Sequence, residues 1–180
     1  MSGFRRMPKC FRKRLSASPP VKEGSPDGSR RSALKAIFIQ EQQSSMDSIE
    51  TFLTAKCFAL AGASRDPEKY GNRILRALLA SGRKVFPLNP NATVIEGIQT
   101  YESIGKLPEV PESLSIVTPP HVTRLVVEQA IRAGVKNLWM QPGAEDLQAS
   151  KQARESGLNV IDDGSCILVR LAVESRSRSQ

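Results

Sequence analysis

The amino-acid sequence predicts an α/β fold, in which helices cover both faces of a mostly parallel sheet of five strands. From about residue 48, short apolar runs typical of buried strands alternate with segments of helical periodicity. Four of these runs end in small or polar turn-forming residues, at 62–64, 89–91, 118–120 and 141–143. Because parallel strands share one carboxyl edge, and ligands bind beyond that edge, we expect a site at these turns.

The first half of the predicted fold contains two strands. Residues 56–64 form an uninterrupted apolar run that ends at small residues, as a strand buried on both faces does. Residues 72–82 place four aliphatic side chains on one helical face, and Gly82 ends that helix. The other elements expected here are a short helix at 48–53, a second strand at 84–90, a small extended piece at 93–101 and a helical turn at 101–107.

The second half contains three more strands, at 113–120, 136–143 and 158–164. The clearest helix spans residues 121–134, where two prolines suit the first turn and a glycine ends the last. Its expected apolar stripe consists of Val122, Leu125, Val126 and Ile131. Residues 144–157 form a helix with acids at its start and bases later, which complements the helix dipole. The apolar segment 166–172 has no clear period.

The first 45 residues differ in composition from the rest of the 180-residue chain. They hold ten basic and three acidic residues, which is +7 of the total net charge of +8. Residues 16–32 are rich in Ser, Pro and Gly and have little to bury. We therefore predict a disordered basic extension at 1–45, a folded domain at 46–173 and a frayed tail at 174–180.

Charge and cysteine usage exclude several classes of protein. Residues 46–180 are nearly neutral, so binding of nucleic acid is not expected of the folded part. No apolar run is long enough to span a membrane. Three cysteines without a CxxC pair, and one histidine, argue against a disulfide scaffold, a structural zinc site and a two-histidine metal site. A cytoplasmic protein is expected, although the basic start would also suit an organellar targeting segment or an interaction tail.

The first strand-to-helix turn, residues 62–72, is the candidate phosphate site. It lacks the GxGxxG spacing but keeps Gly62 at the strand end and Gly71 at the helix start. Free amides at a helix start attract phosphate, Ser64 adds a hydroxyl, and Arg65 and Lys69 add positive charge. The alternative is a purely structural turn, in which Gly71 only permits close packing.

The end of the second strand narrows the choice of nucleotide. An NAD site carries an acid there that holds the ribose hydroxyls, whereas this chain has Asn89, Pro90 and Asn91. Without a carboxylate, the site disfavours NAD and tolerates a phosphorylated ribose, as in NADP or coenzyme A. An ordinary turn is the alternative interpretation of the same residues.

Five motifs carry a resemblance to a known family: GASRDPEKYGNRILRALLASG, VFPLNPNA, IVTPPHV, LWMQPGAED and DDGSCIL, in this order and spacing. They resemble the small stand-alone CoA-binding domain proteins, whose fold is similar to the N-terminal domain of the succinyl-CoA synthetase α subunit. The resemblance covers about Met46 to Ala172. It implies a Rossmann-like, doubly wound domain that binds coenzyme A (CoA) or an acyl-CoA.

The same resemblance implies contacts with the ligand by position. It assigns the pyrophosphate to Gly62, Ala63, Ser64, Arg65, Gly71 and Asn72, the ribose and adenine to Asn89 and Pro90, the border of the nucleotide to Thr118, Pro119 and Pro120, and the pantetheine side to Gln141 and Gly143. It implies no reaction, because binding is the main known property of the family.

No complete catalytic constellation is evident in the sequence. We expect His121 to be exposed or capping, Trp139 to lie in the core, and Asp162 and Asp163 to form a turn rather than a metal site. Cys166 is expected either as a buried apolar residue or as a thiol near the cleft that exchanges with CoA. The sequence thus favours a non-catalytic binder of CoA. The alternative is an NADP-dependent or acyl-CoA-using enzyme that is completed by a partner, whose identity the sequence leaves open.

Overall fold

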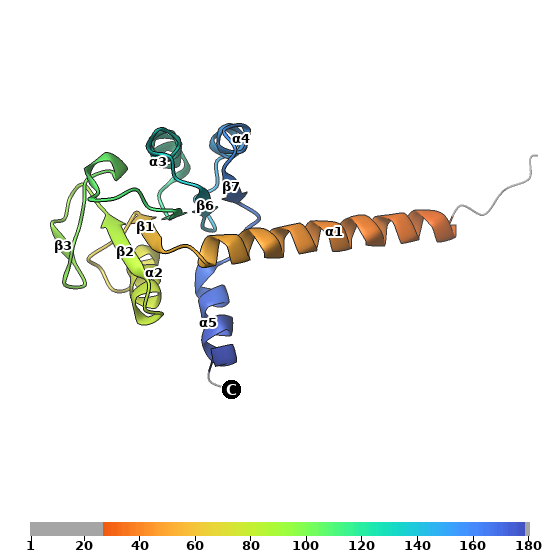
Figure 1. The fold of residues 1–180 in the computed structure, drawn as a ribbon, viewed down its shortest axis with the longest axis horizontal. Coiled ribbons are helices and arrows are strands. Elements are labelled where there is room, and N and C mark those ends of the chain that lie inside the picture. The colour runs from red at the N-terminus through yellow and green to blue at the C-terminus, as the bar shows by residue number, and fades with distance from the viewer. Residues whose placement is uncertain (1–26, 179–180) are drawn as a thin grey trace, which may run out of the picture. The chain divides into compact units, whose positions relative to one another are not determined.

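The computed structural model describes residues 27–178 and contains the predicted parallel sheet (Figure 1). Its five strands are β1 (Cys57–Ala61), β2 (Lys84–Leu88), β5 (Ser113–Ile116), β6 (Asn137–Met140) and β7 (Asn159–Ile161). They are all parallel, in the order β2-β1-β5-β6-β7. The order reverses between β1 and β5, and that switch point is where a doubly wound sheet opens a crevice for a ligand.

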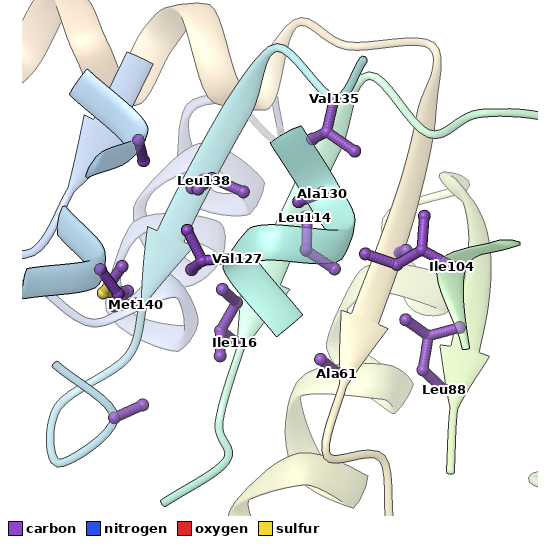
Figure 2. Packing of buried hydrophobic residues seen from close by; sticks show 14 of the residues in the cluster. Ala61, Leu88, Ile104, Leu114, Ile116, Val127, Ala130, Val135, Leu138 and Met140 are labelled. Atoms are coloured by element: carbon purple, nitrogen blue, oxygen red, sulfur yellow. The ribbon is translucent and has the colours of Figure 1, made fainter. Parts of the chain in front are cut away.

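Helices cover both faces of the sheet, as predicted. The helices of the sheet-bearing unit are α2 (Tyr70–Ala80), α3 (Pro120–Ala133), α4 (Leu147–Glu155), α5 (Ile167–Arg178) and the end of α1 (Asp27–Leu53). Side chains of α3 and α4 pack into one apolar cluster, shown from close by in Figure 2, where Val127 and Ala130 of α3 lie against Leu114 and Leu138 of the sheet. Side chains of α1, α2 and α5 pack into a second cluster on the other face.

The burial of β1 shows why its sequence is uniformly apolar. Cys57, Ala59 and Ala61 belong to the first cluster, whereas Phe58 and Leu60 belong to the second. Successive strand residues point to opposite faces, so a central strand with both faces covered has no polar side. The predicted core residue Trp139 is also fully buried in the second cluster, where its ring packs edge-on against Phe52 at 5.2 Å.

Two small elements follow β2 and match the expected extended piece and helical turn. Strands β3 (Val94–Ile95) and β4 (Ile98–Gln99) form an antiparallel hairpin, and a 3₁₀ turn spans Ile104–Lys106. The hairpin turn consists of Glu96 and Gly97, whose φ angles are +50° and +74°. Among the described residues, Glu96 is the only one other than glycine with a positive φ, an arrangement that usually costs energy.

Both ends of the described chain are more helical than the sequence suggested. Helix α1 begins at Asp27, so residues 27–45 are helical although we expected disorder, whereas residues 1–26 lie outside the described part. The run 29–53 contains neither glycine nor proline, which permits an uninterrupted helix. The tail expected to fray from residue 174 continues α5 to Arg178, and Glu174 forms a 2.8 Å ion pair with Arg83.

The predicted stripe of α3 is wrong in part. Leu125 is 58% exposed, and the buried residues of this helix are Thr123, Val127 and Ala130. These three are spaced four and three apart and so share one face. Small and polar side chains thus form part of the inward face, which an apolar pattern alone does not reveal. Among the described residues, no helix is long and apolar enough to cross a membrane.

Deleting residues 1–38 should leave the melting temperature within a few degrees of the full chain. The compact unit that holds the sheet begins at Ile39, and the first side chains in its described core are Ile49 and Phe52. Deletion through Leu53 is the matched control, and it should unfold the domain because it removes both core residues. A drop of more than about 10 °C for the shorter deletion would contradict this boundary, since 1 kcal/mol shifts the melting temperature of such a domain by only about 2–4 °C.

Candidate ligand-binding site

The four predicted turns follow the carboxyl ends of β1, β2, β5 and β6, which lie at one edge of the sheet. A cavity of about 560 Å³ opens beside the switch point, a volume within the range of small-molecule sites. Its lining residues come from the turns after β5 and β6 and from the starts of α2 and α5: Tyr70, Val117, Thr118, Pro119, Pro120, Pro142, Gly143, Ala144 and Cys166. Four of the predicted site residues, Thr118, Pro119, Pro120 and Gly143, are among them.

The first turn is built on an unusually close approach between two glycines. Gly62 has a φ of +91°, and a Cβ placed on Gly71 would lie within 3.0 Å of the Gly62 carbonyl oxygen. Helix α2 therefore starts directly against the end of β1. Gly71 therefore serves close packing, because the space that a side chain would need is filled by backbone.

Two asparagines hold consecutive carbonyl groups of this turn. Asn89, after β2, donates from Nδ2 to the Ala63 carbonyl at 2.7 Å. Asn72, in the first turn of α2, donates from Nδ2 to the Ser64 carbonyl at 2.9 Å. Asn72 is fully buried, and Asn89 also accepts a hydrogen bond from the Asn91 amide at 2.7 Å. Both asparagine amides are therefore engaged within the protein.

The two carbonyl contacts fix the direction of the amides between them. In a trans peptide the N–H points opposite to the C=O of the same unit, so the N–H groups of Ser64 and Arg65 point away from the asparagines. Within residues 27–178, neither of these N–H groups has a hydrogen-bond partner. The Ser64 hydroxyl lies beside them and accepts from the Asp66 amide at 3.1 Å. We call the N–H groups of Ser64 and Arg65 the amide pair; two adjacent free amides are donors available to an anion.

Glu96 brings a carboxylate to the same region from the β3–β4 hairpin. Its Oε1 accepts a hydrogen bond from Asn72 Nδ2 at 2.7 Å, so Asn72 joins the first turn to the hairpin. The Asn72 Oδ1 atom is buried without a hydrogen-bond partner in the described structure. Sequence analysis missed Glu96, because the contact spans 24 residues and no spacing rule predicts it.

A second polar cluster lies where the cavity meets α5. The Tyr70 hydroxyl lies 2.6 Å from the Cys166 sulfur and 3.5 Å from Gln141 Oε1, which also accepts from the Ile167 amide at 3.0 Å. Gln141 is fully buried, and its Nε2 has no partner among the described residues. Burial and the hydrogen bond to Cys166 raise the pKa of Tyr70, so the phenol stays protonated. Cys166 is half-buried and lines the cavity, so of its two expected placements the one near the cleft agrees with the structure and the buried one does not.

The remaining candidates have structural surroundings or lie at the surface. His121 and Pro90 are exposed, as are Arg65 and Lys69 beside the amide pair. Asp162 pairs with Arg154, and Asp163 accepts from the Ser45 hydroxyl at 2.5 Å. In the described part of the chain, no group of three or more His, Cys, Asp or Glu side chains is arranged to hold a metal ion. The amide pair and the cavity are thus the features that suit a ligand with an anionic and an apolar part.

Comparisons with known proteins agree with this fold. The sequence profile described as the CoA binding domain matches residues 56–172. The solved structure of a conserved hypothetical protein from Pyrococcus furiosus is 42% identical, with a TM-score of 0.61, and the match covers 64% of this chain and 98% of that one. Its near-complete coverage shows that similar domains exist as stand-alone proteins.

Two larger proteins contain a similar domain. The α subunit of acetate–CoA ligase (ADP-forming) II from Pyrococcus furiosus is 28% identical over 124 residues, which are 63% of this chain and 27% of that subunit. The dinucleotide-forming acetyl-coenzyme A synthetase 1 of Ca. Korarchaeum cryptofilum is 30% identical with a TM-score of 0.53, over 61% of this chain and 26% of that protein. The chain therefore spans about a quarter of the length of these two relatives.

Proposed function

The chain belongs to the CoA binding domain family, and from this premise we propose that it binds coenzyme A or an acyl-CoA at the carboxyl edge of its sheet. The amide pair of Ser64 and Arg65 is the observation that supports this proposal most directly. CoA has a pyrophosphate, for which two free backbone amides in the turn between β1 and α2 are suitable donors. Arg65 and Lys69 add positive charge at the surface of the same turn.

The adjoining cavity suits the other half of CoA. Valine, proline and alanine dominate its lining, and such a surface accommodates an uncharged flexible arm like pantetheine. Thr118, Pro119, Pro120 and Gly143 would border that arm. Gln141 is fully buried, so it would not contact the arm itself but would position Tyr70, whose hydroxyl lies against its Oε1 atom.

The end of β2 supports CoA over NAD. Asn89 occupies the place of the usual ribose-binding acid, and the nearby carboxylate of Glu96 is already bound by Asn72. The ribose and its 3′-phosphate would lie near Asn89 and Pro90, neither of which carries a negative charge.

Thermal shift and titration calorimetry on the full chain test the proposal. CoA and acetyl-CoA should raise the melting temperature, and a ligand at 100 times its Kd adds about 2.7 kcal/mol of stability. Dephospho-CoA, NADP and NAD are the comparison ligands, and NAD should stabilise least. Tighter binding of NAD or NADP than of CoA would overturn the assignment.

We further propose that the chain alone binds without catalysis and acts as a regulator or carrier in the cytoplasm. The stand-alone relative from Pyrococcus furiosus supports this role, since the match covers 98% of that protein. The ligase relatives favour a second candidate, an acyl-CoA-using enzyme completed by a partner, because they carry the domain within larger chains. Turnover of acetyl-CoA by the purified chain would contradict both candidates, because the first has no catalysis and the second needs a partner.

Replacing Glu96 by glutamine should strengthen CoA binding about two- to fivefold. Glutamine keeps an oxygen that accepts from Asn72 but removes a negative charge close to the amide pair. The gain should shrink at high salt, since part of it comes from screened repulsion. Titration calorimetry at two ionic strengths measures both effects, with Glu102→Gln on the exposed surface as the control. Weaker binding by the Glu96 variant would mean that the charge is needed to hold Asn72.

A further inference from the structure

The cavity at the carboxyl edge contains one thiol among its lining residues, that of Cys166. Cys166 is half-buried, in contrast to Cys57, which lies in the core with 6% of its surface exposed. Burial is the main cause that raises the pKa of Cys57 to about 12, so that thiol is inert. The two described cysteines therefore differ in access, and only Cys166 faces a space that a ligand could enter.

The surroundings of Cys166 suit a sulfur that reacts. It directly precedes α5, a helix of 12 residues, and the N-terminal end of a helix favours negative charge. The Tyr70 hydroxyl lies 2.6 Å from the sulfur. Because the raised pKa of Tyr70 keeps its phenol protonated, this hydroxyl is available to donate to a thiolate.

Gln141 gives an independent indication of a ligand at this end of the cavity. It is fully buried, and its carboxamide contacts the Tyr70 hydroxyl that lines the cavity wall. The Nε2 atom of that carboxamide has no partner among the described residues, although buried donors are nearly always paired. The unpaired donor thus lies next to Tyr70 and Cys166, at the end of the cavity where the reacting sulfur of the ligand would be placed.

We propose that Cys166 forms a mixed disulfide with CoA by exchange with CoA disulfide, an inference that rests on the proposed function. The Cys166 thiol gives its proton to solvent, and the thiolate attacks one sulfur of the CoA disulfide. A bond forms between Cys166 and that CoA, the original S–S bond breaks, and the leaving CoA thiolate takes up a proton. One disulfide replaces another, so the step needs no further oxidant.

Tyr70 connects the two ends of the site in this scheme. It opens α2, whose start adjoins the amide pair, and its hydroxyl contacts Cys166. A CoA whose pyrophosphate lies on the amide pair would extend its arm along the cavity wall toward Cys166. Binding would thus hold the disulfide near the thiol and raise its effective concentration there.

Intact-mass spectrometry of the full chain carrying Cys10→Ser tests the proposal. With CoA disulfide, the protein should gain the mass of one CoA less two hydrogen atoms, a gain that a reductant reverses. Peptide mapping should locate the adduct at Cys166, and Cys166→Ser should form none. Glutathione disulfide, which lacks the nucleotide, should react at least about tenfold more slowly at equal concentration. At saturating CoA disulfide, Tyr70→Phe should slow the exchange about three- to tenfold, because the donor to the thiolate is lost.

The outcomes separate this inference from the proposed function. If the reduced protein binds CoA but forms no adduct, the exchange is refuted and the binding function stands. If the reduced protein binds no CoA at all, both are refuted. Equal rates with the two disulfides would show an accessible thiol without a directing site, and would also overturn the inference.

Discussion

Replacing Gly71 by valine should unfold the domain and not merely weaken its ligand site. A Cβ at this position would lie within 3.0 Å of the Gly62 carbonyl oxygen, which is backbone at the end of a central strand. Neither β1 nor α2 has room to move, because both are packed into the second apolar cluster. We expect the free energy of unfolding to fall by about 3 kcal/mol or more, which is the upper end of the usual cost of overpacking a core position. Urea denaturation followed by circular dichroism measures the loss.

Gly105→Val is the matched control for this substitution. A Cβ at Gly105 would meet nothing within 4 Å, and its φ does not lie in the left-handed region. It should therefore cost less than about 1 kcal/mol. If Gly71 served mainly the phosphate site that the sequence suggested, a bulky residue there would block the ligand before it affected folding. A folded Gly71→Val protein that has lost CoA binding would restore that interpretation.

The strands were predictable because burial on both faces leaves a direct trace in the sequence. β1 and β6 are short runs without charged residues, and turn-forming residues follow each of them. Helical segments that consist mostly of polar residues have a weaker sequence signal. The N-terminal part of α1 and the last turns of α5 are rich in Ser, Arg and Gln, a composition that we interpreted as disordered or frayed. Nothing in the local pattern predicts the ion pair between Arg83 and Glu174, which connects the segment before β2 to α5.

The candidate site was predictable in place but less so in detail. Strand ends and turn residues placed the turns at 62–64 and 118–120, since chain topology alone brings the carboxyl ends of parallel strands together. The roles of individual side chains depend on contacts between distant segments. Asn89 reaches the Ala63 carbonyl across 26 residues, and Tyr70 reaches Cys166 across 96. A single sequence shows that these residue types are present but not which of them meet.

Replacing Asn89 by aspartate should weaken CoA binding about 10- to 100-fold, because it disturbs the amide pair. The Nδ2 donor to the Ala63 carbonyl would be replaced by a carboxylate oxygen, which that carbonyl repels. The peptide between Ala63 and Ser64 would turn, and the Ser64 amide would no longer point toward the ligand. A loss of about 1.4–2.8 kcal/mol corresponds to this range. Titration calorimetry with CoA and dephospho-CoA measures it.

The comparison of the two ligands decides how Asn89 acts. The pyrophosphate is common to both, so a disturbed amide pair should weaken both by the same factor. Repulsion of the 3′-phosphate by the new charge would instead weaken CoA more than dephospho-CoA. Asn91→Asp, on an exposed residue two positions away, adds the same charge without touching the Ala63 carbonyl and should change binding less than about threefold. Because Asn89 contacts the backbone directly, we expect both ligands to lose affinity. CoA should lose more than dephospho-CoA, since its 3′-phosphate would lie near the new charge, and equal losses would mean that the ribose phosphate lies elsewhere.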